Sequence, residues 1–231
     1  MCSVGTLTLL LSWLLVQNPD AGLTGRVLDS TGRGVSGTRA ELHSGSGDFI
    51  RTRADGEGVY RFDSLPPGDY TLKLQSPGFA TLSVKSIHVV GGEQRSLLSL
   101  ELSVSMCGSD AVREYRALEP GVRTGTIAGI VSVWNPRNAH LVKAADVTLV
   151  CGNKTCGTTK TNAPGEFRFA DLAPGDYGFR VRHAGYYPRE EPGTYRVVEG
   201  LEAAHSISLE PCLPGRCDPQ YRPKKAIAIC E

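Results

Sequence analysis

The sequence predicts an all-β protein made of two tandem Greek-key-type β-sandwich domains. Residues 55–79 align without a gap with residues 162–186, so the chain carries one unit twice. Segments of both copies, such as "YTLKL" and "YGFRV", alternate apolar and polar residues with the period of two that is typical of strands. Gly and Pro clusters separate these segments at the spacing of about 8–12 residues expected for short strands of a sandwich.

The N-terminal segment has the pattern of an export signal. Residues 4–16, "VGTLTLLLSWLLV", are almost entirely apolar but too few to span a bilayer as a helix. No Lys or Arg precedes them, and Pro19 lies at position −3 of a cut after Ala21, so a buried strand or helix is the alternative. We assign residues 1–22 to a signal peptide. The mature chain is then expected to be secreted or periplasmic, without an integral membrane span.

The repeat sets the expected domain boundaries. The first sandwich is predicted at residues 23–104 and the second at residues 126–211, followed by a tail rich in Cys and Pro at 212–231. Residues 105–125 are predicted to be a linker. Within it, "DAVREYRAL" could form two helical turns with Asp110 as the N-cap, or a loop.

A long ordered motif occurs in both copies: T-x-(D/N)-x-x-G-x-(Y/F)-x-F-x-x-L-x-P-G-x-Y. Its first occurrence consists of Thr52, Asp55, Gly58, Tyr60, Phe62, Leu65, Pro67, Gly68 and Tyr70. Its second consists of Thr159, Asn162, Gly165, Phe167, Phe169, Leu172, Pro174, Gly175 and Tyr177. This order resembles the carboxypeptidase regulatory-like domain family, which shares a transthyretin-like β-sandwich. The resemblance covers about 24–104 and 126–211 and implies a non-catalytic accessory module.

The chain lacks the motifs of the enzymes related to this fold. None of its five histidines begins the H-x-x-E motif of a zinc carboxypeptidase. The C-terminal Tyr-Arg-Gly-Ser motif of transthyretin-like hydrolases is absent, as is a G-x-S-x-G elbow. We therefore predict no enzyme activity and no cofactor, with a transthyretin-like hydrolase as the remote alternative. The net charge of +1 gives no reason to expect a nucleic-acid partner.

Six cysteines after the apolar segment predict a disulfide framework in an oxidising compartment, with free thiols or a zinc site as alternatives. "CGNKTC" suggests a hairpin with Asn153-Lys154 at its apex, which would bring Cys151 and Cys156 to about 4.5 Å between Cα atoms. "CLPGRC" suggests a type II turn that could join its two cysteines. The last two could tie the linker to the tail. The remaining candidates are Cys212, Cys217, Cys107 and Cys230.

The phrases "LPPGDY" and "LAPGDY" are interpreted as a turn signature of the fold. Proline fixes φ, glycine supplies a positive φ, and tyrosine begins the next strand on the core face. The signature residues are Pro67, Gly68 and Tyr70 in the first copy and Pro174, Gly175 and Tyr177 in the second. Asp69 and Asp176 look like a catalytic pair but lie in different copies.

The predicted function is a binding or structural role at the cell surface or in the periplasm, with an unknown protein or glycan partner. The alternative is a carbohydrate-binding module, because the sandwich superfamily includes starch-binding modules. Such sites stack exposed aromatic rings on sugars, and the candidates are Trp134 and Tyr187. Tyr186 occupies a position that the repeat predicts to be structural.

Overall fold

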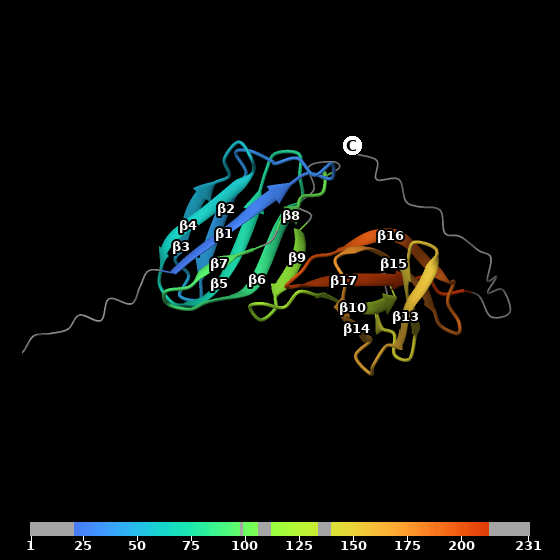
Figure 1. The fold of residues 1–231 in the computed structure, drawn as a ribbon. Coiled ribbons are helices and arrows are strands. Elements are labelled where there is room, and N and C mark those ends of the chain that lie inside the picture. The colour runs from blue at the N-terminus through green and yellow to red at the C-terminus, as the bar shows by residue number, and fades with distance from the viewer. Residues whose placement is uncertain (1–20, 98, 106–111, 134–139, 213–231) are drawn as a thin grey trace, which may run out of the picture.

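The computed structural model describes residues 21–97, 99–105, 112–133 and 140–212. These residues form strands and loops only, arranged as two β-sandwich domains side by side (Figure 1). The predicted all-β tandem architecture is therefore confirmed.

In the first domain, one sheet has the order β4-β1-β7, with β8 also pairing with β1. Its strands are β1 (Ala21–Leu28), β4 (Val59–Leu65), β7 (Gln94–Ser96) and β8 (Leu100–Glu101). The facing strands are β2 (Arg39–Ser44), β3 (Phe49–Arg53), β5 (Gly68–Gln75) and β6 (Thr81–Val89), in the order β6-β5-β2-β3.

The second domain repeats this plan. Strands β10 (Gly125–Val133), β11 (His140–Leu141), β14 (Glu166–Leu172) and β17 (Leu201–Leu209) form one side of its sandwich. The other sheet has the order β13-β12-β15-β16 and consists of β12 (Asp146–Cys151), β13 (Lys154–Lys160), β15 (Gly175–Arg182) and β16 (Arg189–Val197).

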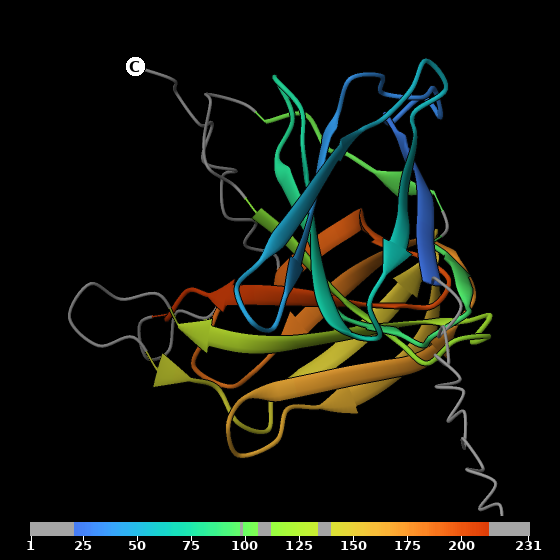
Figure 2. The same cartoon turned by 90° about the vertical axis from the view of Figure 1, so that its left-hand side faces the viewer.

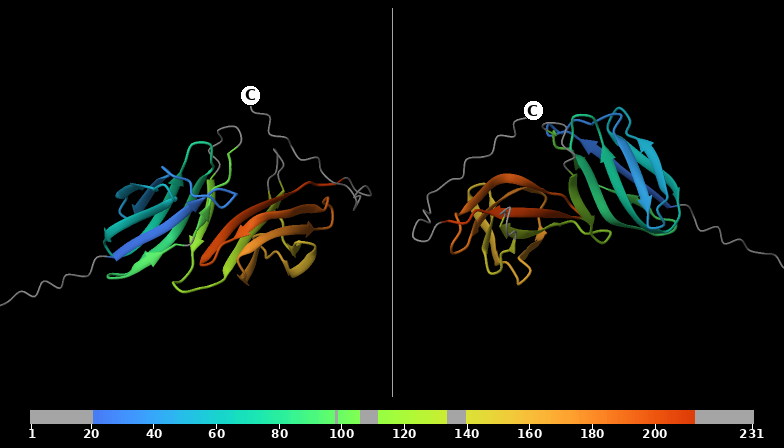
Figure 3. Two further views of the ribbon diagram at one scale, coloured as in Figure 1. Left: turned by 45° about the horizontal axis from the view of Figure 1, so that its top comes forward. Right: turned by 180° about the vertical axis from the view of Figure 1, so that it is seen from behind.

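Strand β9 (Val112–Ala117) joins the two domains into one continuous sheet. It pairs in parallel with β6 and antiparallel with β17, so a nine-stranded sheet crosses the domain boundary. Figure 2 looks from the first domain toward the second and shows their strands running in very different directions, and Figure 3 shows β9 between them. Residues 112–117 are thus neither the predicted helix nor a loop. Tyr115 and Ala117 alternate onto a buried face, and that pattern favours a strand.

Each domain has its own hydrophobic core, and the first core extends across β9. Tyr70, Leu72 and Leu74 of β5 are buried at alternate positions, as the sequence predicted. The corresponding residues of β15 behave in the same way. Leu201 and Ala203 of β17 belong to the core of the first domain, so the second domain contributes directly to its packing.

The first strand begins slightly before the predicted domain boundary. Ala21 is fully buried and pairs with Leu65, and Gly22 pairs with Gln94. Both residues therefore lie in β1, inside the segment assigned to the signal peptide. The other residues assigned to the signal peptide lie outside the described part of the chain.

The predicted disulfide between Cys151 and Cys156 is present, with a Cα–Cα distance of 5.9 Å. The hairpin differs from the prediction, because Cys151 pairs with Lys154 and the two-residue loop is Gly152-Asn153. Gly152 has a φ of 58°, which such a tight loop requires. The register shifts by one residue beside the loop, which leaves Cys156 in a β-bulge.

Cys212 is also disulfide-bonded. Its predicted partner Cys217, and likewise Cys107 and Cys230, lie outside the described residues, so the rest of the framework stays a prediction.

The repeated phrase forms the same hydrogen bond in both domains. The Tyr70 hydroxyl donates to the Pro66 carbonyl at 2.7 Å, and the Tyr177 hydroxyl donates to the Ala173 carbonyl at 2.8 Å. Each tyrosine ring is buried while its hydroxyl closes the turn that precedes it. This bond explains why the tyrosine follows the Pro-Gly pair at a fixed distance.

The glycines of the signature have the predicted positive φ, with values of 157° at Gly68 and 159° at Gly175. Ser64 and Asp171 are also left-handed, at 56° and 54°. They lie in β-bulges where the register of the ladders between β1 and β4 and between β10 and β14 shifts.

Candidate binding groove at the domain junction

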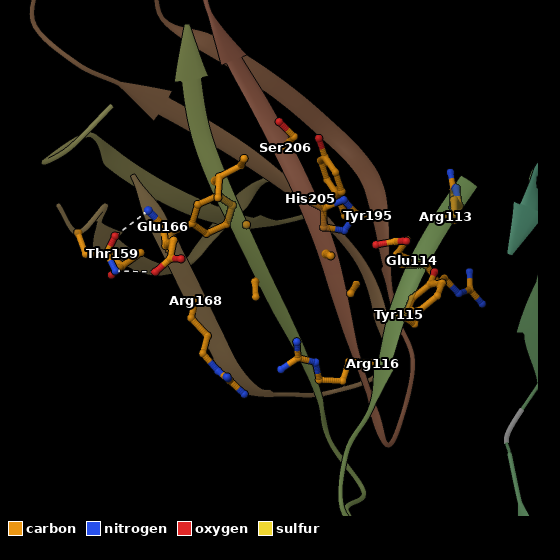
Figure 4. A pocket seen from close by; sticks show the side chains of 18 of the residues that line it. Arg113, Glu114, Tyr115, Arg116, Thr159, Glu166, Arg168, Tyr195, His205 and Ser206 are labelled. Carbon is orange, nitrogen blue, oxygen red and sulfur yellow. Dashed lines mark hydrogen bonds between the residues drawn. The ribbon is translucent and has the colours of Figure 1, made fainter. Parts of the chain in front are cut away.

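A groove of about 1290 Å³ lies where β9 meets the second domain. Residues of β9, β10, β14, β16 and β17 line it, together with the end of β13 and the loop that follows (Figure 4). The connecting strand β9 and the second domain therefore form one surface.

The groove forms because β9 and β17 diverge. They pair only where Ala117, Arg116 and Tyr115 face Leu201, Glu202 and Ala203. Beyond this point β9 continues along β6, whereas β17 continues along β10 as far as Leu209. The two strands therefore make a fork, visible in Figure 4 as the widening space between them.

Main-chain groups of both strands point into this fork. The Leu118 amide donates to the Gly200 carbonyl at 2.8 Å, at the closed end of the fork. Alternate residues of a strand direct their N–H and C=O groups to the same side. Counting from Gly200 along β17, those of Ala204 and Ser206 face the fork, past the last ladder pair with β9.

The floor of the groove consists mainly of small side chains. Ala128 of β10 lies beside Ala204 of β17, and Ser206 follows on the same face. Ile130 adds an apolar side chain that is 37% exposed. A floor of this kind allows another backbone to approach closely.

Arginines stand on both sides of this floor. Arg168 of β14 reaches across to Glu202 of β17, with 2.9 Å between the charged atoms. Arg116 lies on the opposite wall, next to Glu202 in the ladder, and has no ion pair among the described residues. Glu202 therefore pairs with Arg168 and leaves Arg116 without an ion-pair partner among the described residues, so this part of the groove is positive.

His205 occupies the inner side of the fork (Figure 4). Its ring packs edge-on against Tyr195 of β16 with 4.2 Å between centroids, and its Nε2 has no hydrogen-bond partner within the described structure. Burial, with a smaller contribution from the positive charge of Arg113, lowers the pKa of His205 to about 4. The imidazole is therefore neutral near pH 7.

Tyr187, one of the two predicted carbohydrate candidates, does not line this groove. Trp134 lies outside the described residues. Tyr187 is half-buried, and its amide donates to the Glu210 carbonyl at 2.9 Å. Tyr186 packs on the second core and its hydroxyl lies 3.0 Å from His140 Nε2, in line with the structural position predicted for it.

The two aspartates of the repeated phrase do not form a catalytic pair. Asp69 contacts His88 at 2.9 Å, and Asp176 contacts Arg196 at 3.2 Å in the other domain. Each carboxylate has its own partner on an exposed strand.

The described residues contain neither a candidate metal site nor a helix that could cross a membrane. No group of three or more His, Cys, Asp or Glu side chains there could hold a metal ion. None of the described elements is a helix with the length and apolarity to cross a membrane.

Sequence reasoning missed the groove because it assigned β9 to a linker. The usable signal was the end of "VREYRA", where Tyr115 and Ala117 are buried and Arg116 between them is exposed. No local pattern marks the fork itself, since it depends on which strands β9 pairs with.

The chain belongs to the carboxypeptidase regulatory-like domain family, whose model matches residues 22–103 and again residues 126–210. Colossin-A of Dictyostelium discoideum is 26% identical over 181 residues, covering 76% of this chain and 2% of that protein. Serine-aspartate repeat-containing protein F of Staphylococcus epidermidis is 27% identical over 174 residues, covering 70% and 10%. The chain thus spans a tenth or less of these two relatives. The solved structure of a streptococcal ancillary pilin matches 85% of this chain and 63% of its own, with 14% identity and a TM-score of 0.32.

Proposed function

We propose that this chain is a non-catalytic, extracytoplasmic binding protein whose ligand occupies the groove between β9 and β17. The observation that carries the proposal is the construction of the groove from the connecting strand β9 and the second domain on one continuous sheet. Because β9 ties the domains together and Leu201 and Ala203 pack in the first core, the walls are held in place before a ligand arrives. Such preorganisation reduces the entropic cost of binding.

The extracytoplasmic location is supported by the cysteines and by the N-terminal sequence. The Cys151–Cys156 disulfide persists best in an oxidising compartment. The apolar residues 4–16 have the length of a signal peptide core. Cell fractionation combined with protease protection tests the location. The proposal is contradicted if the chain resists external protease in intact cells and is released only together with cytoplasmic markers.

Hydrogen–deuterium exchange of the full chain tests the groove. The chain is incubated with a pool of polypeptides and, separately, with a pool of oligosaccharides. The exchange rates of the backbone amides are then compared with those of the free chain. We expect a ligand to slow exchange in 112–117 and 201–209. Protection that avoids both segments while another face binds contradicts the proposal.

In the carbohydrate-binding alternative, Tyr187 and Trp134 are the residues that would contact the sugar. Tyr187 is half-buried, and aromatic rings are the side chains that stack on sugars. A glycan array with the Tyr187→Ala variant separates the two proposals, because loss of glycan binding in that variant favours the alternative.

A further inference from the structure

We propose that the groove binds an extended acidic polypeptide, which adds as a strand to the open edge of β17. This inference rests on the proposed function and names the class of its ligand. Three features support it: unpaired main-chain groups, small side chains and uncompensated positive charge.

The open edge is the first feature. Past Ala203, the main-chain groups of Ala204 and Ser206 on the fork side have no strand opposite them in the described part of the chain. An edge of this kind is completed by a polypeptide in extended conformation, which forms a ladder of hydrogen bonds with it. A sugar chain offers no comparable repeat of donors and acceptors. The edge therefore favours a peptide over a glycan.

The shape of the groove is the second feature. On the outer face, Ala204 and Ser206 of β17 lie beside Ala128 and Ile130 of β10. Ala204 and Ser206 are exposed and short, so side chains of an added strand can lie across them without a clash. On β9, Val112 is 53% exposed and offers an apolar contact on the opposite wall.

Charge complementarity is the third feature and determines the kind of peptide. Arg116 has no ion-pair partner among the described residues, whereas Arg168, on the other side of the floor, is paired with Glu202. Glu114 on the same wall is already paired with Lys85 at 2.8 Å. A strand with Asp or Glu at alternate positions can place its carboxylates near these guanidinium groups.

The test uses the full chain and a fluorescent peptide of about eight alternating Glu and Thr residues, because Thr favours extended backbone. Binding is measured by anisotropy at low salt. Two further peptides carry N-methyl groups on all Glu or on all Thr residues, which removes the amide donors from one edge at a time. We expect at least one of them to bind about tenfold more weakly, since each lost hydrogen bond is worth about 1 kcal/mol. Equal binding of all three peptides overturns strand addition.

Variants of the chain test the site. Arg116→Glu is expected to weaken binding of the acidic peptide about tenfold, as charge reversal at a contact typically does. Arg61→Glu is the matched control, because Arg61 is exposed and occupies the repeat position of Arg168 in the first domain. Unchanged affinity in Arg116→Glu, or equal losses in both variants, overturns the assignment.

A backbone variant tests the edge itself. Ser206→Pro removes a main-chain N–H that faces the fork. Ser208→Pro is the control, because it removes an N–H from the same edge of β17 at a residue that does not line the groove. We expect only Ser206→Pro to weaken binding. If either variant fails to fold, the N-methylated peptides still decide the question. A sulfated hexasaccharide that binds in an Arg116-dependent way, while the peptide does not, overturns strand addition and leaves the proposed function standing.

Discussion

The two copies of the domain share a motif but end differently. In the first copy the last segment forms two short strands, β7 of three residues and β8 of two, which pair with successive parts of β1. In the second copy the equivalent segment is β17, a single strand of nine residues that pairs with β10 along almost its whole length. A continuous edge can accept another strand, whereas a broken one cannot. This difference explains why β9 joins the second copy at β17.

The two domains also differ at the edge strands β6 and β16. β9 extends the first domain at β6, whereas the corresponding strand of the second domain, β16, is an edge of its sheet within the described residues. The repeat therefore supplies the two sandwiches, and the segment between them decides how they are connected. A pair of similar domains becomes one unit with a groove that neither copy contains alone.

The largest effect on stability is expected at β9, the strand that connects the two domains. Tyr115→Ala removes a buried ring that packs in the first core beside residues of β17, and should lower the free energy of unfolding by about 3 kcal/mol. We expect the intact chain to unfold in one calorimetric transition, because the first core includes residues of β17, and the Tyr115→Ala variant to unfold in two. The control is Val112→Ala on the same strand, which is exposed and should change little. A single, unshifted transition in Tyr115→Ala contradicts the role of β9.

The next effect concerns His205, for which the first copy has the exposed Ser96 in the aligned position. The folded-state pKa is lowered to about 4, against 6.5 for the free side chain, so folding favours the neutral ring. The stabilisation is fully present above pH 6.5 and is lost as the pH falls toward 4. The loss approaches about 3 kcal/mol, from 1.36 kcal/mol for each pKa unit.

Denaturant titrations between pH 7 and 4 measure this loss. His205→Phe keeps a ring against Tyr195 but removes the titrating group, so its stability should depend less on pH over this interval. The same pH dependence in both proteins shows that another group is responsible.

A smaller effect is expected where one hairpin is covalently closed and its counterpart is not. The repeat aligns Cys151 and Cys156 with Ser44 and Phe49 of the hairpin between β2 and β3. There the Ser44 amide donates to the Asp48 carbonyl at 2.8 Å instead. The double change Cys151→Ser and Cys156→Ser should destabilise the second domain by about 2 kcal/mol, the value expected for so short a loop.

Thermal unfolding of this variant under non-reducing conditions is the measurement. Ser44→Ala is the matched control in the first domain, and it should cost less because it removes only side-chain hydrogen bonds to Ser46 and Asp48. Equal losses in the two variants contradict the comparison.

Much of the fold could be predicted because its determinants are local. Alternating residues such as Tyr70, Leu72 and Leu74 show which face is buried, and the repeat confirms the pattern in an independent copy. The Cys151–Cys156 pairing was also predictable from spacing. The loop at its tip was not, because a bulge at Cys156 shifts the register without a sequence mark.

The candidate site was much less predictable. Its walls come from β9 and β14 and its edge from β17, which are far apart in the sequence. Arg116 and Arg168 have no unusual context when each is considered alone. They line one groove because β9 follows β6 from Val112 to Arg116 but pairs with β17 only from Tyr115 to Ala117.

The smallest effect should have the opposite sign and comes from a single atom that distinguishes the two copies. Tyr60 is fully buried and its hydroxyl has no hydrogen-bond partner in the described structure, whereas the second copy has Phe167 at this position. Gly25 and Gly129 leave room for these rings, since a Cβ at either glycine would meet the aromatic side chain. Tyr60→Phe should therefore stabilise the first domain by about 1 kcal/mol, because it removes an unsatisfied polar group without a large cavity. Phe167→Tyr is the reciprocal variant and should destabilise the second domain, as judged by chemical denaturation. A loss of stability in Tyr60→Phe means that the hydroxyl has a partner, such as a buried water.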